Sequence, residues 1–272
     1  MIFTENSEFN LNGIEAREYP DIDLTLSPDF VNMSINDFKS MILQTNYACS
    51  LDEARVVLTG VNIKINDDNL ECSATDSYRL ALRKDKLRST VKNSADIIVP
   101  SKNLNELLKL LSSGDDGEIE MHLFSNKVIF KFGNILFQSR LISGTYPNTK
   151  NLIPSDSIFD LSIDCNEFYN MVDRASILNN DTDNNIITLE IKNNLLKITS
   201  MSLEIGKVEE KMNISCDNDI KISFSAKYMM DALRTIKSKN VILTFVGEIK
   251  PILLKNDDSN NLVCLILPIR TY

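Results

Sequence analysis

The sequence is poor in the residues on which catalytic and phosphate-binding sites usually depend. Its 272 residues include one histidine, no tryptophan and only 8 glycines. No G-x-G-x-x-G, G-x-x-x-x-G-K-[ST], H-E-x-x-H or G-x-S-x-G motif occurs, so the common nucleotide-binding loops, zinc proteases and serine hydrolases are not indicated. The histidine, His122, lies in an alternating, strand-like stretch. We expect it to be a surface side chain, because catalytic histidines act in clusters.

Cysteines and long apolar runs are also scarce. The 5 cysteines are widely spaced and form no C-x-x-C pair, a pattern typical of reduced thiols in a cytosolic protein. The longest apolar run, residues 262–269, is far shorter than the roughly 18 residues that a bilayer-spanning helix needs. Residues 1–10 contain no apolar stretch and predict no signal peptide. We therefore expect a cytoplasmic protein with no metal site and no cofactor.

The charge balance excludes a uniformly basic, nucleic-acid-coating surface. There are 29 lysines and arginines against 38 aspartates and glutamates, a net charge of -9. Basic residues gathered on one face remain compatible with this balance. The composition, 43% hydrophobic and 25% charged, is that of a globular protein, and the length predicts about two domains.

The most informative feature is an internal repeat. Residues 33–36 (MSIN) and 161–164 (LSID) are similar, and each precedes a segment with apolar residues at helical spacing. Two strands joined by an Asn- or Asp-rich turn follow in each copy, and then a second strand, helix and set of strands. The repeat predicts two domains of one α+β kind, with helices on one face of antiparallel sheets.

The repeat also sets the expected boundaries. We predict a first remnant over residues 1–28, a middle domain over 29–150 and a C-terminal domain over 151–272. The predicted helices span residues 37–47, 102–112, 165–178 and 225–238. A strand is predicted over residues 56–65. Sequences that resemble capping boxes begin at Ser34, Asn103 and Asp164.

Four segments carry a resemblance to a known family. They are ATDSYRLA at residues 74–81, RLISGTYP at 140–147, FSAKY at 224–228 and LPIR at 267–270. In this order they closely resemble signatures of the bacterial DNA polymerase III beta subunit, the sliding clamp, whose protomer consists of three copies of one fold. The match covers essentially the whole chain but leaves out most of the first clamp domain. Residues 9–20 resemble the last strand of that domain.

The resemblance implies a protein that encircles duplex DNA and tethers the replicative polymerase without chemistry of its own. Lys102 and Lys109, like Lys227 and Arg234, are seven residues apart and share a helix face, for which simple solvation is the alternative explanation. Contacts from such cations to phosphates carry no sequence information. The predicted DNA-facing residues are Lys102, Lys109, Lys227, Arg234 and Lys237. Weaker candidates, offset by acidic neighbours, are Lys39, Arg55 and Arg174.

The family also binds short peptide motifs of DNA polymerase and clamp-loader subunits, in an apolar cleft between its second and third domains. Carried over by motif, the cleft comprises Leu58, Thr75, Ser77, Tyr78, Arg79, Leu80, Pro147, Leu152, Tyr228, Leu265, Leu267, Pro268, Ile269 and Arg270. For Leu58, Leu80 and Leu267, plain core packing is the alternative. Ser77-Tyr78 stands where some members have Gly-His, which leaves the exact peptide preference open.

The full-length family protein is a head-to-tail homodimer ring, an arrangement that needs two different patches to close. Ile177 and Leu178 match its third-domain contact, and at least one of them should point outward. A rival interpretation is a nucleic-acid-processing enzyme on a duplicated α+β scaffold. It would need clustered carboxylates or histidines, whereas the paired aspartates here lie in turn-like sequences. A purely structural oligomer is a third alternative.

Overall fold

The chain repeats one strand–helix–three-strand unit four times. The computed structural model describes residues 1–19, 21–88, 90–91, 93–111, 117–179, 185–202 and 204–270. The first unit consists of β3 (Phe30–Ser34), α1 (Ile35–Thr45), β4 (Gly60–Asn66), β5 (Asn69–Thr75) and β6 (Arg79–Lys86). The second consists of β7 (Ala95–Pro100), α2 (Ser101–Leu110), β8 (Glu118–Leu123), β9 (Lys127–Phe132) and β10 (Ile135–Arg140).

The other two units make up the C-terminal half. The third unit consists of β11 (Phe159–Asp164), α3 (Cys165–Ser176), β12 (Ile186–Lys192), β13 (Leu195–Ser202) and β14 (Gly206–Asn213). The fourth consists of β15 (Ile220–Ser225), α4 (Ala226–Leu233), β16 (Asn240–Phe245), β17 (Ile252–Asn256) and β18 (Leu262–Ile266). Short 3-10 helices are η1 (Ala16–Glu18), η2 (Asn46–Ala48), η3 (Glu53–Thr59), η4 (Thr149–Leu152) and η5 (Ile177–Asn179).

The two halves share one sheet. Its eight strands have the order β11-β16-β17-β18-β6-β5-β4-β7, and the halves meet where β6 pairs with β18 in antiparallel register, Leu80 opposite Leu265. Each half also contributes a four-stranded sheet, with the orders β10-β9-β8-β3 and β14-β13-β12-β15. A continuous backbone ladder therefore holds the halves edge to edge.

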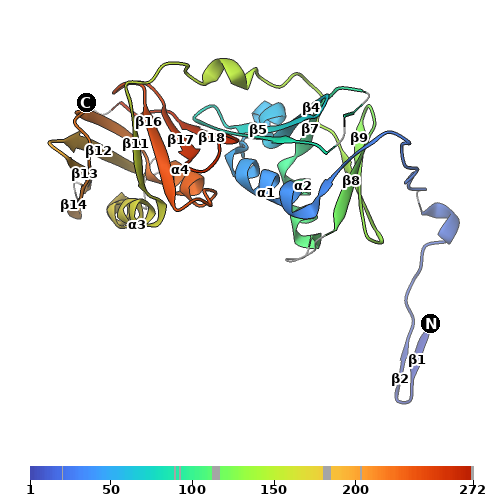
Figure 1. Cartoon of the computed structure of the whole chain (residues 1–272). Coiled ribbons are helices and arrows are strands. Elements are labelled where there is room, and N and C mark those ends of the chain that lie inside the picture. Colours follow the sequence, from blue (N-terminus) through green and yellow to red (C-terminus); the bar gives the residue numbers. More distant parts are fainter. Residues whose placement is uncertain are drawn as a thin grey trace.

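The helices and the connecting segment lie on opposite sides of the eight-stranded sheet. In Figure 1 the segment that joins the halves, around η4, runs above this sheet, and α1, α3 and α4 lie below it. Helix α1 packs on β5 and β6, and α3 packs on α4. The predicted α+β organisation with helices and antiparallel sheets is confirmed. None of the described helices combines the length and the hydrophobicity that a bilayer crossing requires.

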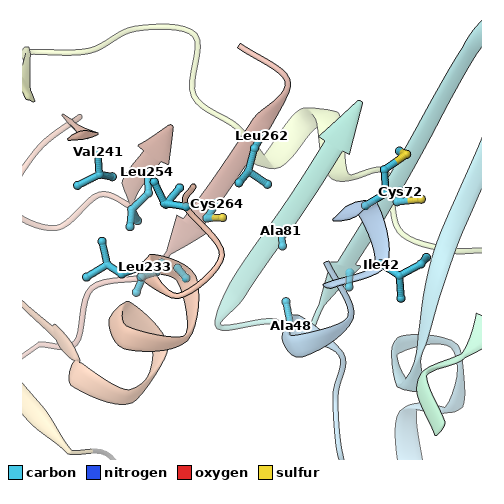
Figure 2. Close-up of a cluster of buried hydrophobic side chains, with 14 of the residues drawn as sticks. Ile42, Ala48, Cys72, Ala81, Leu233, Val241, Leu254, Leu262 and Cys264 are labelled. Carbon is cyan, nitrogen blue, oxygen red and sulfur yellow. The ribbon is translucent and has the colours of Figure 1, made fainter. Parts of the chain in front are cut away.

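One hydrophobic core extends through both halves. Figure 2 shows Ile42 and Ala81 on one side of the β6–β18 boundary and Cys264 and Leu233 on the other, all of them buried. Burying an aliphatic side chain contributes roughly 1.5–3 kcal/mol, so the shared core stabilises the junction as well as each half. Across the boundary, the Gln44 amide donates a hydrogen bond of 3.0 Å to the carbonyl of Thr235.

The predicted helices all form, with shifted ends. The helix expected over 225–238 ends at Leu233, so Arg234 is its C-cap and Lys237 lies beyond it. The others run over Ile35–Thr45, Ser101–Leu110 and Cys165–Ser176, and residue 112 of the second prediction is outside the described residues. Helix α1 is followed directly by η2 and α3 by η5, and apolar spacing alone does not separate the end of an α-helix from a 3-10 turn.

Two of the three predicted caps are correct. The side chains of Ser34 and Asp164 accept hydrogen bonds from the third backbone N–H of α1 and α3, at 3.2 and 2.9 Å. The third prediction is wrong, because α2 begins at Ser101 and Asn103 lies inside it. Asn103 instead donates a 2.8 Å hydrogen bond to Ser139 on β10, a partner that only the tertiary fold supplies.

The strand predicted over 56–65 is half wrong. Residues Glu53–Thr59 form η3, and β4 begins only at Gly60. A Cβ atom at Gly60 would lie 2.7 Å from the carbonyl oxygen of Val99, so a larger residue would push β4 away from β7. The apolar residues of η3 are similar to a strand pattern because they too are partly buried, packing against Ile98 of β7 and against Tyr146 of the connecting segment.

The prediction that His122 is a surface residue is wrong. The residue is only 2% exposed. Nδ1 lies 2.8 Å from the carbonyl oxygen of Ser27 and Nε2 lies 3.0 Å from the Glu120 carboxylate, while the ring packs 5.0 Å from that of Phe30. Alternation along β8 correctly indicated a strand, but residues before β3 cover the face that it assigned to solvent.

The N-terminal residues form a separate hairpin. Strand β1 (Ile2–Thr4) pairs with β2 (Ser7–Phe9), and Figure 1 shows this hairpin standing away from the rest of the chain. The single strand expected over 9–20 is therefore wrong: only Phe9 is in a strand, and Pro20 lies outside the described residues. Exposed apolar side chains of the segment include Ile2, Phe3 and Phe9.

Thiol labelling tests the packing of the cysteines. Burial raises the pKa of Cys49 and Cys72 to about 12 and that of Cys264 to about 11, and Cys165 is also buried. Only Cys216 is partly exposed. Because the thiolate is the reactive form, we expect iodoacetamide at pH 8 to modify Cys216 first and the other thiols only on unfolding. Mass spectrometry of peptides over time measures this, and early modification of Cys264 would contradict it.

Candidate functional site

A tight turn between β5 and β6 forms one wall of the candidate site. The Asp76 carboxylate accepts hydrogen bonds of 2.9 and 3.0 Å from the backbone N–H groups of Tyr78 and Arg79. The Thr75 hydroxyl accepts one of 3.1 Å from the N–H of Ser77 and donates one of 2.6 Å to the carbonyl of Arg79. Ser77 has a φ of 81°, a left-handed conformation that favours glycine. The side-chain bonds around it hold the turn in this shape.

The motif at residues 140–147 stabilises this turn through a hydrogen bond of Tyr146. The Tyr146 hydroxyl accepts a 3.0 Å hydrogen bond from the N–H of Thr75. Gly144 has a φ of +133°, and a Cβ atom there would meet the Val57 side chain at 2.7 Å. The glycine therefore lets the chain pass close to η3 before it reaches Pro147.

A cavity of about 300 Å³ opens at the junction of the two halves, on the side of the connecting segment. We call it the cleft. It is lined by Leu58, Thr75, Ser77, Tyr78, Arg79, Leu80, Pro147, Leu152, Leu265 and Leu267. All ten belong to the set carried over by motif. They come from η3, from β5, β6 and the turn between them, from the segment between β10 and η4, from η4, and from β18 and the segment after it. The fold thus brings together residues that are far apart in the sequence.

The lining divides into a buried floor and an accessible rim. Leu80 and Leu265 are buried in a small cluster with Leu253, so the core-packing explanation also applies to them. Leu58 is buried with Tyr146 in a second cluster. By contrast, the side chains of Tyr78, Leu152 and Leu267 are exposed and available to a ligand.

The other four predicted residues lie beside the cleft. Pro268, Ile269 and Arg270 line an adjoining cavity of about 590 Å³, which Leu267 also lines. The N–H of Leu267 donates to the carbonyl of Tyr78 at 2.9 Å, and that of Ile269 to the carbonyl of Ser223 at 2.7 Å. The segment after β18 therefore separates the two cavities. Tyr228, the fourth residue, packs under the Arg79 guanidinium, 4.4 Å from its ring centroid.

Arg79 is the central charged group of the cleft. Nε lies 2.9 Å from the Asp76 carboxylate, Nη1 lies 2.7 Å from that of Asp231, and Nη2 donates to the carbonyl of Tyr47 at 2.8 Å. Burial alone would lower the pKa of Arg79. The hydrogen bond to Asp231 and the two carboxylate charges outweigh burial and raise it, so the guanidinium stays charged.

Sequence reasoning missed two residues of this arrangement. Arg55, considered only as a weak DNA-facing candidate, donates a 2.7 Å hydrogen bond to the Ser77 hydroxyl and so lies beside the cleft. Asp231, which no sequence motif marks, pairs with Arg79 at 2.7 Å. Each also has a partner three residues away, Asp52 for Arg55 and Arg234 for Asp231, but the contacts that bring them to the cleft join residues 22 and 152 positions apart.

The five cations predicted to face DNA are all exposed. We use the name helix face for the set Lys102, Lys109, Lys227, Arg234 and Lys237, which lie on or directly after α2 and α4. Three of them have side-chain partners: Lys109 is 2.7 Å from Glu106, Arg234 is 3.2 Å from Asp231, and Lys237 donates to Ser40 at 3.0 Å.

The weaker cationic candidates and the predicted ring contact lie elsewhere. Lys39 donates to the carbonyl of Leu111, and Arg174 pairs with Glu210 at 2.7 Å. Ile177 and Leu178 begin η5 directly after α3; Ile177 is exposed and Leu178 is half-buried. At least one of the pair points outward, as expected. Among the described residues, no three His, Cys, Asp or Glu side chains are grouped as metal ligands.

The whole architecture matches solved DNA clamps. The DNA polymerase sliding clamp from Bacillus subtilis superposes with a TM-score of 0.92 at 39% identity, covering 98% of this chain and 71% of that chain. The DNA polymerase III beta chain from Streptococcus pneumoniae gives a TM-score of 0.91 at 30% identity, covering 99% of this chain and 72% of that chain.

The sequence comparisons agree with the structural ones. The model of the DNA polymerase III beta subunit central domain matches residues 32–148, and that of its C-terminal domain matches residues 150–270. The beta sliding clamp of Staphylococcus epidermidis is 43% identical over 274 residues, covering 100% of this chain and 72% of the relative; that of Staphylococcus aureus is 42% identical with the same coverage. The chain therefore belongs to the beta sliding clamp family, the non-catalytic processivity subunit of DNA polymerase III. This assignment favours a clamp over a nucleic-acid-processing enzyme.

Proposed function

We propose that this chain supplies the middle domain (29–150) and the C-terminal domain (151–272) of a cytoplasmic clamp that slides on duplex DNA and holds its partners by short peptides. Residues 1–28 are then the end of a first clamp domain. The domain assignment is supported by the two family matches, which meet between residues 148 and 150. The chain spans 72% of its curated relatives, which leaves room for one further domain.

The observation that carries the peptide-binding proposal is the cleft itself. A cavity of about 300 Å³ with mostly aliphatic lining suits two or three apolar side chains of a peptide. The exposed rim leucines, Leu152 and Leu267, offer contact area. The exposed Arg55 and the backbone of the turn at Ser77 provide the few polar groups that fix the direction of a peptide. The natural partners would be segments of DNA polymerase and clamp-loader subunits.

The DNA-binding part of the proposal rests on charge distribution. The chain is acidic as a whole, with a net charge of -9, yet the helix face carries five exposed cations. An acidic exterior repels the DNA backbone, whereas a modest number of cations on one face attracts it without reading bases. Such contacts exchange readily along the duplex, which suits sliding.

The ring proposal rests on the α3–η5 corner. Exposed Ile177, with Leu178 beside it, forms a small apolar patch next to β14, one of the two edge strands of its sheet. In the full-length protein this patch would meet the first domain of a second copy, giving a head-to-tail homodimer ring.

Direct peptide binding tests the function. We expect a fluorescently labelled pentapeptide with two aliphatic anchors and a terminal aromatic anchor to bind the 272-residue chain with a Kd of micromolar order, about -8 kcal/mol. Fluorescence anisotropy measures this affinity, and unlabelled peptide should displace the probe. The control peptide has the same composition with all anchors replaced by alanine. Equal binding of both peptides, or of neither, would contradict the assignment.

A further inference from the structure

A single carboxylate connects the cleft with the helix face. Asp231 on α4 has one oxygen, Oδ2, at 2.7 Å from Nη1 of Arg79, and its other oxygen, Oδ1, at 3.2 Å from Nη1 of Arg234. Arg79 lines the cleft, and Arg234 belongs to the helix face. The Asp231 side chain is 21% exposed and that of Arg234 is 60% exposed, so the carboxylate faces the junction on one side and open solvent on the other.

On the cleft side, the ion pair with Asp231 binds Arg79 to the C-terminal half. The Arg79 side chain is only 10% exposed. Its other polar partners, Asp76 and the carbonyl of Tyr47, belong to the middle half, whereas Asp231 and the ring of Tyr228 belong to α4. The strength of the Arg79–Asp231 pair therefore governs how firmly the turn between β5 and β6 is held against α4, and with it the shape of the cleft.

On the solvent side, Arg234 contacts both the Tyr169 hydroxyl and the Asp231 carboxylate. Nη2 and Nε donate hydrogen bonds of 2.8 and 3.1 Å to the Tyr169 hydroxyl on α3, and only Nη1 reaches Asp231. The 3.2 Å contact to Asp231 is the longer of the two ion pairs made by this carboxylate. A phosphate can accept two parallel, charge-assisted hydrogen bonds from the Arg234 guanidinium. Because this guanidinium is exposed, it can leave Asp231 and bind a phosphate with little rearrangement.

We propose that Asp231 couples DNA on the helix face to peptide binding in the cleft; this inference rests on the proposed function. When a phosphate draws Arg234 away, the full charge of Asp231 acts on Arg79. The Arg79–Asp231 pair then tightens and orders the cleft wall before a peptide arrives. A pre-ordered wall binds its peptide more strongly, because less freedom is lost on binding. By linkage, a bound peptide raises DNA affinity by the same factor.

The test measures peptide affinity with and without DNA. The 272-residue chain is titrated into the labelled pentapeptide at low ionic strength, alone or with a saturating short DNA duplex. We expect the wild-type chain to bind the peptide about fivefold more tightly with the duplex, at the lower end of typical couplings. The readout is the ratio of the peptide affinity with DNA to that without DNA. A variant that only damages the fold changes both affinities by the same factor and leaves this ratio unchanged.

Two variants and a matched control assign the coupling to Asp231. Arg234→Gln releases Asp231 permanently, so it should bind peptide about fivefold more tightly without DNA and show a ratio near one. Asp231→Asn should also show a ratio near one. The control is Glu106→Gln on α2, which removes the carboxylate 2.7 Å from Lys109, another cation of the helix face, without touching the cleft. It should keep the wild-type ratio.

The outcomes are distinguishable. A wild-type ratio of one, with both ligands bound, overturns the coupling and leaves the proposed function standing. Weaker or unchanged peptide binding by Arg234→Gln in the absence of DNA also overturns it. A ratio near one in Glu106→Gln would show that any change of charge on the helix face abolishes the DNA dependence of peptide affinity. That result would overturn the specific role of Asp231. A wild-type chain that binds no peptide overturns the proposed function and this inference together.

Discussion

Replacing Leu152 and Leu267 together with alanine is expected to weaken peptide binding by roughly 30- to 100-fold. Each leucine lies on the accessible rim of the cleft, 48% and 37% exposed. Alanine truncation costs more than about 1 kcal/mol only at the minority of contact residues that carry most of the binding energy, and two such losses reach this range. Fluorescence anisotropy with the labelled pentapeptide measures the change.

The rim leucines are the right targets because they are not part of the core. Leu80 is 1% exposed, and a buried Leu→Ala change costs about 2–5 kcal/mol of folding stability, which would confuse the result. Leu136→Ala is the matched control, since this leucine on β10 is 40% exposed and lies outside the cleft. It should retain wild-type affinity. Wild-type affinity in the Leu152→Ala, Leu267→Ala double variant would remove the rim from the assigned site.

Adding a complete first clamp domain ahead of residue 29 is expected to change the chain from a monomer into a closed dimer that stays on circular DNA. The 272 residues offer the Ile177–Leu178 patch, but the described residues ahead of residue 29 form the hairpin β1–β2 and η1 rather than a complete first domain with the matching surface. A head-to-tail ring closes only when both patches are present. Light scattering over a concentration series measures the assembly, and gel filtration measures retention on circular plasmid, which should vanish once the plasmid is cut.

The assembly prediction also has a matched control. Ile177→Ser combined with Leu178→Ser should prevent closure of the extended protein. Ile158→Ser should not, although Ile158 and Ile177 are equally exposed at 60%. A closed dimer of the 272-residue chain that persists in the Ile177→Ser, Leu178→Ser variant would contradict the assignment of this patch.

Local sequence explains the elements that formed as expected. Apolar spacing located all four helices, and the caps at Ser34 and Asp164 form because donor and acceptor are three residues apart. The Asn- and Asp-containing turns after β4 and β12 place Asp67, Asn193 and Asn194 at positive φ, a conformation that these residue types tolerate. These interactions are complete within a few residues, and at these positions no distant partner replaces them.

The predictions that proved wrong concern residues whose partners are distant in the sequence. Asn103 failed as a cap because Ser139 attracts its amide, and His122 is buried because a segment 95 residues away covers it. Arg55 reads as one more surface cation until the Ser77 turn accepts its hydrogen bond. In each case the decisive partner is remote in sequence, and periodicity carries no information about which distant segment covers a face.

The sequence alone determined that this protein is a duplicated α+β chain of the sliding clamp family, because repeats and family motifs are local patterns that survive without coordinates. Tertiary structure decided how those motifs meet. Leu80 and Leu265 line one cavity only because β6 pairs with β18. Asp231 pairs with Arg234 because the two are three residues apart, but it reaches Arg79 only because α4 lies beneath the β6–β18 pairing. The physical reason is that burial and charge pairing depend on distances through space. The tertiary fold sets these distances, and the order of residues along the chain does not reveal them.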